Sequence, residues 1–339
     1  MTPRLASLLL GLATTAAFGQ IAGLKPGPGA VADGRIAIPA GVDPATEIPI
    51  TVMRGAKPGP TLAIIAGTAG TAYGPIGATY QLSKLVDLSK VSGTIIVVHI
   101  ANLPAFVGRT VYGNPIDHKD LDRSFPGKAD GTSSERIAHA LTTQVISQAD
   151  YLVSLQAGGT NTLLLPHVFE AVSGDDKLDS KMAAMARAFG ITHIVMDKNV
   201  KRPSGTVENA AVSTGKPVLK VMCGSFGIAD NRTLDAITKG IISLMDLLEM
   251  TPGKPANTRT PVYIDQTATM DSPQSGILSV YVQRGQNVRK GESVYSIGGF
   301  QNKNVQEMHS PIDGIVLYVI STPPVNKGET VVLLGAPRQ

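Results

Sequence analysis

The sequence predicts an α/β fold in which a mainly parallel sheet is flanked by helices and followed by a small β-barrel. Two observations predict this arrangement. Over residues 34–250, short apolar runs alternate with longer segments whose apolar residues recur at helical spacing. After residue 260, short strands separated by glycine turns replace that alternation. The first pattern is typical of helices packed over a parallel sheet, and the second of a barrel.

The first strand of the alternating region, residues 61–65, is apolar after its threonine and ends in a glycine-rich loop, residues 66–74. An open α/β sheet places its chemistry in such loops, yet this loop contains no His, Asp, Glu, Cys or Lys. The remaining elements follow from their apolar spacing. Strands are expected at 93–100, 151–155 and 218–222, and helices at 75–85, 133–148, 179–189 and 230–249.

The C-terminal part has a weak internal repeat. Residues 251–260 are predicted to be a linker, and residues 261–337 a separate β domain. In its first half Gly-Ile-Leu (276–278) precedes Lys-Gly-Glu (290–292), and in its second half Gly-Ile-Val (314–316) precedes Lys-Gly-Glu (327–329). The repeat predicts two similar hairpin halves that interlock in the small barrel.

The charge balance excludes nucleic acid as a partner. The chain has 30 basic and 26 acidic residues, a net charge of +4, and it contains no tryptophan for base stacking. No run of basic residues is longer than the pair Lys201-Arg202. The single cysteine, Cys223, cannot form an internal disulfide and is expected to be a small buried residue.

Residues 1–19 have the form of an export signal peptide. Arg4 supplies the positive start, residues 5–17 form an apolar stretch too short to span a bilayer, and small residues precede a cleavage point before Gln20. The mature protein is therefore expected in the periplasm or outside the cell. Since no later apolar run is long enough for a transmembrane helix, a membrane-spanning protein is not expected.

Five stretches of the chain carry a resemblance by their order and spacing. They are residues 66–72, 102–109, 117–127 (Asp-His-Lys-Asp-Leu-Asp-Arg-Ser-Phe-Pro-Gly), 135–141 with 149–159, and the C-terminal β domain. Together they resemble the succinylglutamate desuccinylase/aspartoacylase family of zinc-dependent deacylases. The resemblance implies a carboxypeptidase-like deacylase domain over residues 34–250.

In such family members a His and a Glu from the first loop and a His from a later turn bind zinc. A Glu at the end of a further strand acts as general base or acid on the zinc-bound water. In this chain Ala69 and Ala72 stand at the loop positions, Gln156 at the later His and Met222 at the catalytic Glu. Zinc needs N, O or S donors, and it is the zinc that activates the water. These four residues therefore imply a pocket without metal and no cofactor.

The substrate side of the resemblance is better preserved. Arg109, Asp122 and Arg123 stand where the family uses Arg, Asn and Arg to bind a substrate carboxylate, a task that suits the planar fork of arginine. The expected ligand is therefore a small molecule that bears a carboxylate. The change to Asp122, however, would place a carboxylate beside Arg123 and could neutralise it in an internal ion pair.

Two functions remain open from the sequence. The first is an exported, catalytically degenerate, zinc-free member of the family that binds a small ligand or a partner. The second is an active metal-dependent hydrolase of amide or ester bonds in N-acyl amino-acid-like compounds, with the metal at a relocated site. The ligand-rich cluster for such a site is Asp117, His118, Asp120 and Asp122. The sequence leaves the oligomeric state open.

Overall fold

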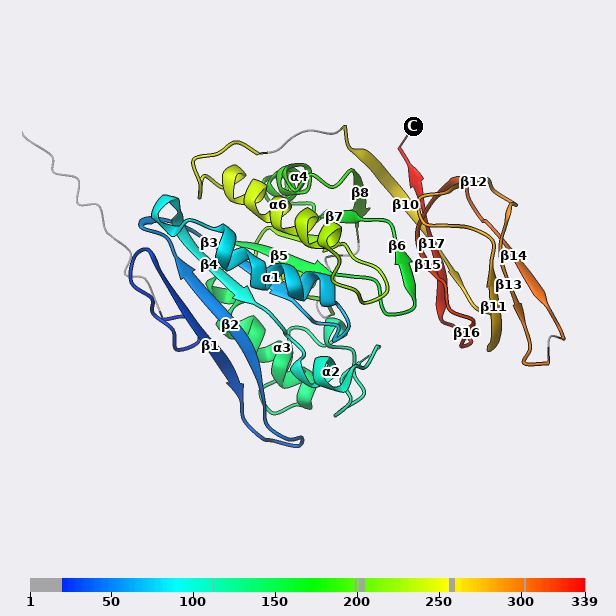
Figure 1. Cartoon of the computed structure of the whole chain (residues 1–339), viewed down its shortest axis with the longest axis horizontal. Coiled ribbons are helices and arrows are strands. Elements are labelled where there is room, and N and C mark those ends of the chain that lie inside the picture. The colour runs from blue at the N-terminus through cyan, green and yellow to red at the C-terminus, as the bar shows by residue number, and fades with distance from the viewer. Residues whose placement is uncertain are drawn as a thin grey trace, which may run out of the picture.

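The computed structural model describes residues 20–111, 113–198, 200, 205–255, 260–301 and 303–338, and it shows a mixed α/β fold around one large sheet (Figure 1). The strands of this sheet are β1 (Ala30–Ile38), β2 (Thr46–Arg54), β3 (Lys57–Ala66), β4 (Ser92–Val98), β5 (Tyr151–Gln156), β6 (Thr162–Leu164), β7 (His167–Ala171), β8 (His193–Asp197), β9 (Val218–Met222), β10 (Val262–Asp271), β12 (Asn287–Val288), β15 (Gly314–Ile320) and β17 (Thr330–Pro337). Their order across the sheet is β1-β2-β4-β3-β5-β9-β7-β8-β10-β17-β15-β12, with β6 paired to β15.

The centre of the sheet is parallel, but the sheet as a whole is mixed. Strands β4, β3, β5 and β9 pair in parallel, as do β7 with β8 and β8 with β10. Strands β1 and β2 pair antiparallel because residues 39–45 are too short a connection for a parallel crossover. Strand β7 runs antiparallel to β9 because no helix between β5 and β7 carries the chain back across the sheet. The prediction of a mainly parallel sheet is therefore correct only for its centre.

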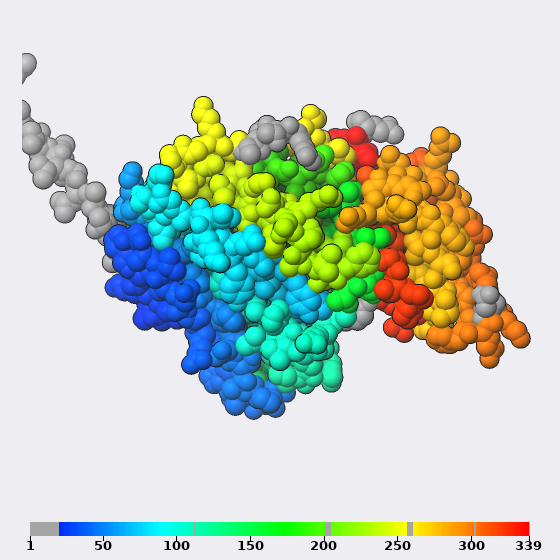
Figure 2. Space-filling model, in the orientation of Figure 1, coloured from blue at the N-terminus to red at the C-terminus, as the bar shows by residue number. Residues whose placement is uncertain are grey.

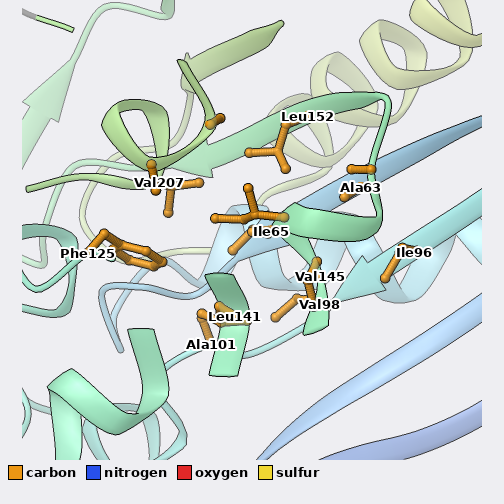
Figure 3. Close-up of a cluster of buried hydrophobic side chains, with 14 of the residues drawn as sticks. Ala63, Ile65, Ile96, Val98, Ala101, Phe125, Leu141, Val145, Leu152 and Val207 are labelled. Atoms are coloured by element: carbon orange, nitrogen blue, oxygen red, sulfur yellow. The ribbon is translucent and has the colours of Figure 1, made fainter. Parts of the chain in front are cut away.

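Helices cover both faces of the parallel centre. On one face α1 (Tyr73–Leu85), α4 (Asp176–Ala188) and α6 (Asn231–Leu247) enclose a core that contains Leu62, Ile64 and Leu155. On the other face α3 (Ser133–Gln144) and α5 (Val207–Ser213) enclose a second core. Figure 3 shows side chains of this core, among them Ile65 and Leu141. Short helix α2 (Leu103–Gly108) follows β4. The alternation of residues along β3 thus supplies an apolar side chain to each layer in turn.

The predicted strands and helices of the alternating region are confirmed, with shifts at their ends. Helix α4 begins earlier than predicted because the Asp175 side chain accepts hydrogen bonds from the backbone N–H groups of Lys177 and Leu178. The predicted helix over 133–148 ends as an α-helix at Gln144 and continues as a 3-10 turn. Strands β1, β2, β7 and β8 and helix α5 lie outside the predicted elements.

The C-terminal strands form two layers, one of which continues the large sheet. Strands β10, β17, β15 and β12 belong to the large sheet, whereas β11 (Gly276–Val280), β13 (Ser293–Gly298), β14 (Gln306–His309) and β16 (Pro324–Val325) form a second sheet. Both layers contribute to one apolar core that includes Met270, Tyr295 and Val316. This part forms one end of the molecule, in direct contact with the rest (Figure 2). The predicted strands are present, and their closure into a barrel stays a prediction.

The predicted repeat has a counterpart in two similar turns. In each Lys-Gly-Glu motif the glycine is left-handed, with φ of 85° at residue 291 and 82° at residue 328. The glutamate of each motif accepts a hydrogen bond from the backbone N–H three residues before it, at 2.9 and 3.0 Å. The two halves therefore use the same turn, which requires glycine at the same place.

Some predicted segments lie outside the described residues. These are the export signal peptide, residues 1–19, and residues 256–259 of the linker. The domain boundaries at 34–250 and 261–337 stay predictions. Within the described ranges, no helix is both long enough and apolar enough to cross a membrane.

The loop between β3 and α1 packs so closely against α2 that its second glycine has no space for a side chain. A Cβ at Gly70 would lie 2.3 Å from the backbone carbon of Ala105. We expect Gly70→Ala to lower the free energy of unfolding by about 1–3 kcal/mol, because backbone must move to relieve the overlap. Urea unfolding measures the change. Gly27→Ala is the matched control, since a Cβ there meets nothing within 4 Å. Equal stability of the two variants would contradict the close packing.

Candidate functional site

The four residues at the predicted pocket lie at neighbouring strand ends. Strands β3 and β5 pair in parallel up to their last residues, and the register of β5 and β9 places Gln156 opposite Met222. The loop after β3 turns tightly, because the Ala72 N–H donates to the Ala69 carbonyl at 3.2 Å. The fold therefore brings the residues of the glycine-rich loop to the same edge of the sheet as Gln156 and Met222.

The Gln156 side chain is held by neighbours in the protein. Its Nε2 donates to the Thr68 hydroxyl at 2.8 Å and to the Ser154 hydroxyl at 3.4 Å. Its Oε1 lies 3.1 Å from the Thr68 hydroxyl, which can donate to it. Asn102 Nδ2 in turn donates to the Thr68 carbonyl at 3.3 Å. Because Gln156 and Thr68 are both buried, these bonds fix the amide in place.

A cavity of about 130 Å³ lies beside this network. Its lining residues come from the loop after β3, from α2 and from the segment that follows: Thr68, Ala69, Gly70, Asn102, Ala105, Val111, Gly113 and Asp120. The walls combine methyl groups with the polar atoms of Thr68, Asn102 and Asp120. Of the four predicted pocket residues, Ala69 lines this cavity directly.

The residues at the predicted ligand positions do not fit zinc. The methyl groups of Ala69 and Ala72 carry no lone pair, and the Gln156 amide is engaged in the hydrogen bonds just described. In the described part of the chain, no three His, Cys, Asp or Glu side chains are placed to hold a metal ion. The residues at the four positions therefore do not form the donor set that zinc requires.

Two carboxylates of the ligand-rich cluster, residues 117–122, accept hydrogen bonds from the loop itself and from the start of α3. Asp117 accepts hydrogen bonds from the backbone N–H of Ser134 at 2.7 Å and from its hydroxyl at 2.9 Å, at the start of α3. Asp120 accepts from the backbone N–H of Asp122 at 3.0 Å. These carboxylates therefore fix the path of the loop against α3.

The predicted carboxylate-binding residues are placed apart from the cavity. Arg109 is exposed at the C-terminal end of α2 in a left-handed conformation, with φ of 53°. Arg123 has 85% of its side chain exposed and pairs with Asp120 at 3.4 Å. Arg109, Asp122 and Arg123 are all absent from the residues that line the cavity.

The predicted pairing of Asp122 with Arg123 is wrong. Both residues belong to the short 3-10 helix Leu121–Arg123, on which successive side chains point about 120° apart. Asp122 consequently points inward to Lys220, whereas Arg123 points to solvent.

A largely buried lysine beneath the strand ends, Lys220, with 19% of its side chain exposed, is the main feature of the site that the sequence reasoning missed. The Lys220 Nζ lies 3.5 Å from Asp122 Oδ2, 3.7 Å from Glu208 Oε2 and 5.7 Å from the centre of the Phe169 ring. Lysine is rarely buried unless it is paired. The available signal was a single charge inside the apolar run Val-Leu-Lys-Val-Met of β9.

In this cluster the Lys220 ammonium forms ion pairs with two carboxylates, those of Asp122 and Glu208. Burial acts to raise the pKa of Glu208, but Lys220 and hydrogen bonds from Thr206 and Ser154 outweigh it and leave that pKa lowered. Burial raises the pKa of Asp122 to about 7, against the opposing attraction of Lys220. Burial acts to lower the pKa of Lys220, but the two carboxylates outweigh it and leave that pKa raised. Lys220 therefore stays charged, and Asp122 takes up a proton near neutral pH.

Ser154 lies between the ion cluster and the cavity wall. It stands opposite Lys220 in the register of β5 and β9. Its hydroxyl accepts a hydrogen bond from Gln156, which bonds to Thr68 on the cavity wall. The segment of β5 beside Lys220 is thereby tied to the cavity wall.

His167 lies on the far side of Met222 in the same row of the sheet. The register of β7 and β9 sets the two residues opposite each other. The His167 Nδ1 donates to the Leu165 carbonyl at 2.8 Å, and burial lowers the pKa of the imidazole to about 4. His167 is therefore neutral at pH 7, and its Nε2 has no hydrogen-bond partner among the described residues.

One region of the chain contains the loop after β3, the strand ends and the ion cluster, and this region matches a known family. The Succinylglutamate desuccinylase/Aspartoacylase catalytic domain matches residues 58–248. The chain belongs to this family. The predicted resemblance is thereby confirmed, and the family is one of deacylases that use zinc in general.

Relatives share most of the chain's length. The N-alpha-acetyl-L-2,4-diaminobutyric acid deacetylase of Halomonas elongata is 26% identical over 298 residues, which is 86% of each chain. Among solved structures, a succinylglutamate desuccinylase/aspartoacylase from Rhodobacter sphaeroides matches with a TM-score of 0.82 at 24% identity, over 91% of this chain and 96% of that one. The product-bound ectoine utilization protein EutE (DoeB) from Ruegeria pomeroyi gives 0.82 at 23% identity, over 90% and 95%. At these identities the structures show a shared fold.

The excess carboxylate of the ion cluster predicts a pH-dependent stability. The pKa of Asp122 is raised by folding, so the folded state keeps a proton that the unfolded chain loses between pH 3.8 and about 7. The contribution of Asp122 is therefore complete below this window and falls as pH rises through it. We expect Asp122→Asn to gain stability relative to the wild type from pH 4 to pH 8, on the order of 2 kcal/mol, in urea unfolding series.

Asp235→Asn, which removes an exposed carboxylate from α6, is the matched control and should keep the wild-type pH profile. A difference between Asp122→Asn and the wild type that is the same at all pH values would rule out protonation of this cluster near neutrality.

Proposed function

We propose that the chain is an exported, zinc-free member of its family that binds a small ligand at the strand-end site without hydrolysing it. The observation that carries the proposal is the set of residues at the four positions where the family resemblance expects zinc ligands and a catalytic glutamate. Ala69, Ala72, Gln156 and Met222 supply neither a metal-binding set nor a carboxylate to activate water. Hydrogen bonds from Gln156 to Thr68 and Ser154 stabilise the site in that state.

The cavity supports a ligand of small size and mixed polarity. About 130 Å³ is lined by the methyl groups of Ala69 and Ala105 and by the polar groups of Thr68, Asn102 and Asp120. Arg109 is exposed and does not line the cavity itself, but it stands two residues before Val111, which does. We propose it for a ligand carboxylate that extends beyond the cavity. Export through the signal peptide at residues 1–19 is part of the same proposal.

The second candidate is a metal-dependent hydrolase of amide or ester bonds in N-acyl amino-acid-like compounds. The name of the Halomonas elongata relative, a deacetylase of an N-acetyl amino acid, favours it. Under this alternative the metal needs ligands away from Ala69, Ala72 and Gln156. The two candidates therefore differ in whether the folded protein binds zinc.

A zinc titration separates the candidates. We expect the mature chain, starting at Gln20, to retain less than about 0.1 zinc per protein after dialysis against zinc and removal of free metal, because the pocket lacks a set of donor atoms. Elemental analysis gives the stoichiometry. Zinc bound one to one and removable by a chelator would overturn the zinc-free proposal and favour the hydrolase.

Restoring the family's donors tests whether the scaffold is otherwise intact. We expect the combination Ala69→His, Ala72→Glu, Gln156→His and Met222→Glu to bind about one zinc, because His and Glu supply the donor atoms that the present residues lack. The pairing of Gln156 with Met222 supports this design. The control combination Ala69→Asn, Ala72→Gln and Met222→Gln places neutral amides there and should bind none. If the restored variant folds, as judged by circular dichroism, and still binds no zinc, these positions are not the family's ligand positions.

A further inference from the structure

The structure has a second and larger hollow, whose lining residues differ from those of the strand-end cavity. It has a volume of about 560 Å³, within the range usual for small-molecule sites. It is formed by the segment after β6, the loop after β9, the start of α6 and one residue of the C-terminal β layers: Leu163, Leu165, Pro166, Cys223, Gly224, Ser225, Phe226, Ile228, Asp230, Arg232, Thr233, Ala236 and Arg284. We call it the α6 groove. It shares no lining residue with the strand-end cavity.

The walls of the α6 groove are mainly apolar. Leu163, Leu165 and Pro166 line one part, and Phe226 and Ile228 another. Phe226 has 38% and Ile228 53% of its surface exposed. Removing apolar surface from water is favourable. An aliphatic chain that covers these side chains would therefore stabilise the complex by about 25 cal/mol for each Å² of apolar surface buried.

Two guanidinium groups face this apolar surface. Arg284 Nη1 donates to the Leu164 carbonyl at 3.1 Å and to the Ser225 hydroxyl at 2.8 Å, which fixes its position on the wall. Arg232, in the first turn of α6, is exposed, and the described residues offer its side chain no hydrogen bond or ion pair. Guanidinium groups bind carboxylates through paired hydrogen bonds.

The acidic residue of the groove is already engaged. Asp230 caps α6, with Oδ1 accepting from the Thr233 N–H at 3.0 Å and Oδ2 from the Thr233 hydroxyl at 2.8 Å. Two arginines and one carboxylate leave the lining with a net positive charge. An anionic group is therefore favoured over a cationic one.

The loop that carries Phe226 is held in an unusual conformation. Phe226 has φ of 57°, a left-handed value that is uncommon for a bulky residue. Its N–H donates to the Thr162 carbonyl at 3.0 Å, and the Gly158 N–H donates to the Gly224 carbonyl at 3.0 Å. Strained residues of this kind cluster at binding sites, and here the strain keeps an aromatic ring partly exposed on the groove wall.

We propose that the α6 groove binds a small aliphatic carboxylate, with the carboxylate at Arg232 and Arg284 and the chain against Leu165, Phe226 and Ile228. The lining of this site shares no residue with that of the strand-end cavity.

Octanoate is the probe that tests the proposal. In isothermal titration calorimetry of the full mature chain, octanoate should bind with a 1:1 stoichiometry. It should bind at least about tenfold more tightly than 1-octanol or octylamine, because only the carboxylate pairs with the arginines. Arg232→Gln should weaken octanoate about tenfold. Ala236→Leu, which adds volume on the groove side of α6, should do the same by filling the groove.

Arg35→Gln is the matched control, since it removes an exposed arginine paired with Glu47 on β1 and β2, and it should leave octanoate binding unchanged. Because Arg232 is exposed and its side chain has no hydrogen bond or ion pair with the described residues, its variant remains informative even if Arg284→Gln disturbs the loop. Absence of saturable octanoate binding, equal binding of octylamine, or unchanged affinity in both Arg232→Gln and Ala236→Leu would overturn the proposal. None of these results would bear on zinc binding at the strand ends.

Discussion

Parallel pairing of β3, β5 and β9 is the constraint on which the strand-end site depends. Backbone hydrogen bonds set the register, so Gln156 lies opposite Met222 whatever their side chains are. The loop after β3 is placed in the same way, because β3 ends beside β5. A family scaffold can therefore keep its geometry while its reactive groups are exchanged. In this chain the space between the strand ends and α2 is bounded by side chains that bond to one another, with Thr68 and Gln156 as the central pair.

The same register puts Lys220 below that pair, and the charge requires partners. An ammonium in the interior loses its hydration, so its burial is tolerated only where opposite charges compensate it. Asp122 and Glu208 come from two segments that lie on the same face of the sheet, the 3-10 helix Leu121–Arg123 and α5. The cluster therefore ties both segments to β9. It also explains why Asp122 points inward, although the family resemblance had placed it beside Arg123 among the residues for a substrate carboxylate.

The apolar runs that became β3, β5 and β9 are local patterns, and the helical spacing of α1, α3, α4 and α6 is local too, so these elements were predicted closely. Pairings between distant segments were not visible. The partner of Lys220 lies 98 residues away in a polar loop, and nothing near Asp122 in the sequence distinguishes it from Asp120. Strand β1 alternates in exposure, and in β2 the apolar residues are interrupted by Pro49 and Thr51, so neither has a strong apolar run. The hydrogen bonds of Gln156 depend on Thr68, which the sequence presents only as one more small polar residue in a glycine-rich loop.

The continuation of the large sheet into the C-terminal strands has a mechanical consequence. Strand β10 pairs with β8 on one edge and with β17 on the other, and β6 pairs with β15. A hinge between the two parts would have to break these backbone ladders at once. The C-terminal strands and the strands beside the site therefore belong to one continuous hydrogen-bonded sheet. The α6 groove, which takes Arg284 from the C-terminal strands and the rest of its lining from the other part of the chain, is thereby held together by the same continuous sheet.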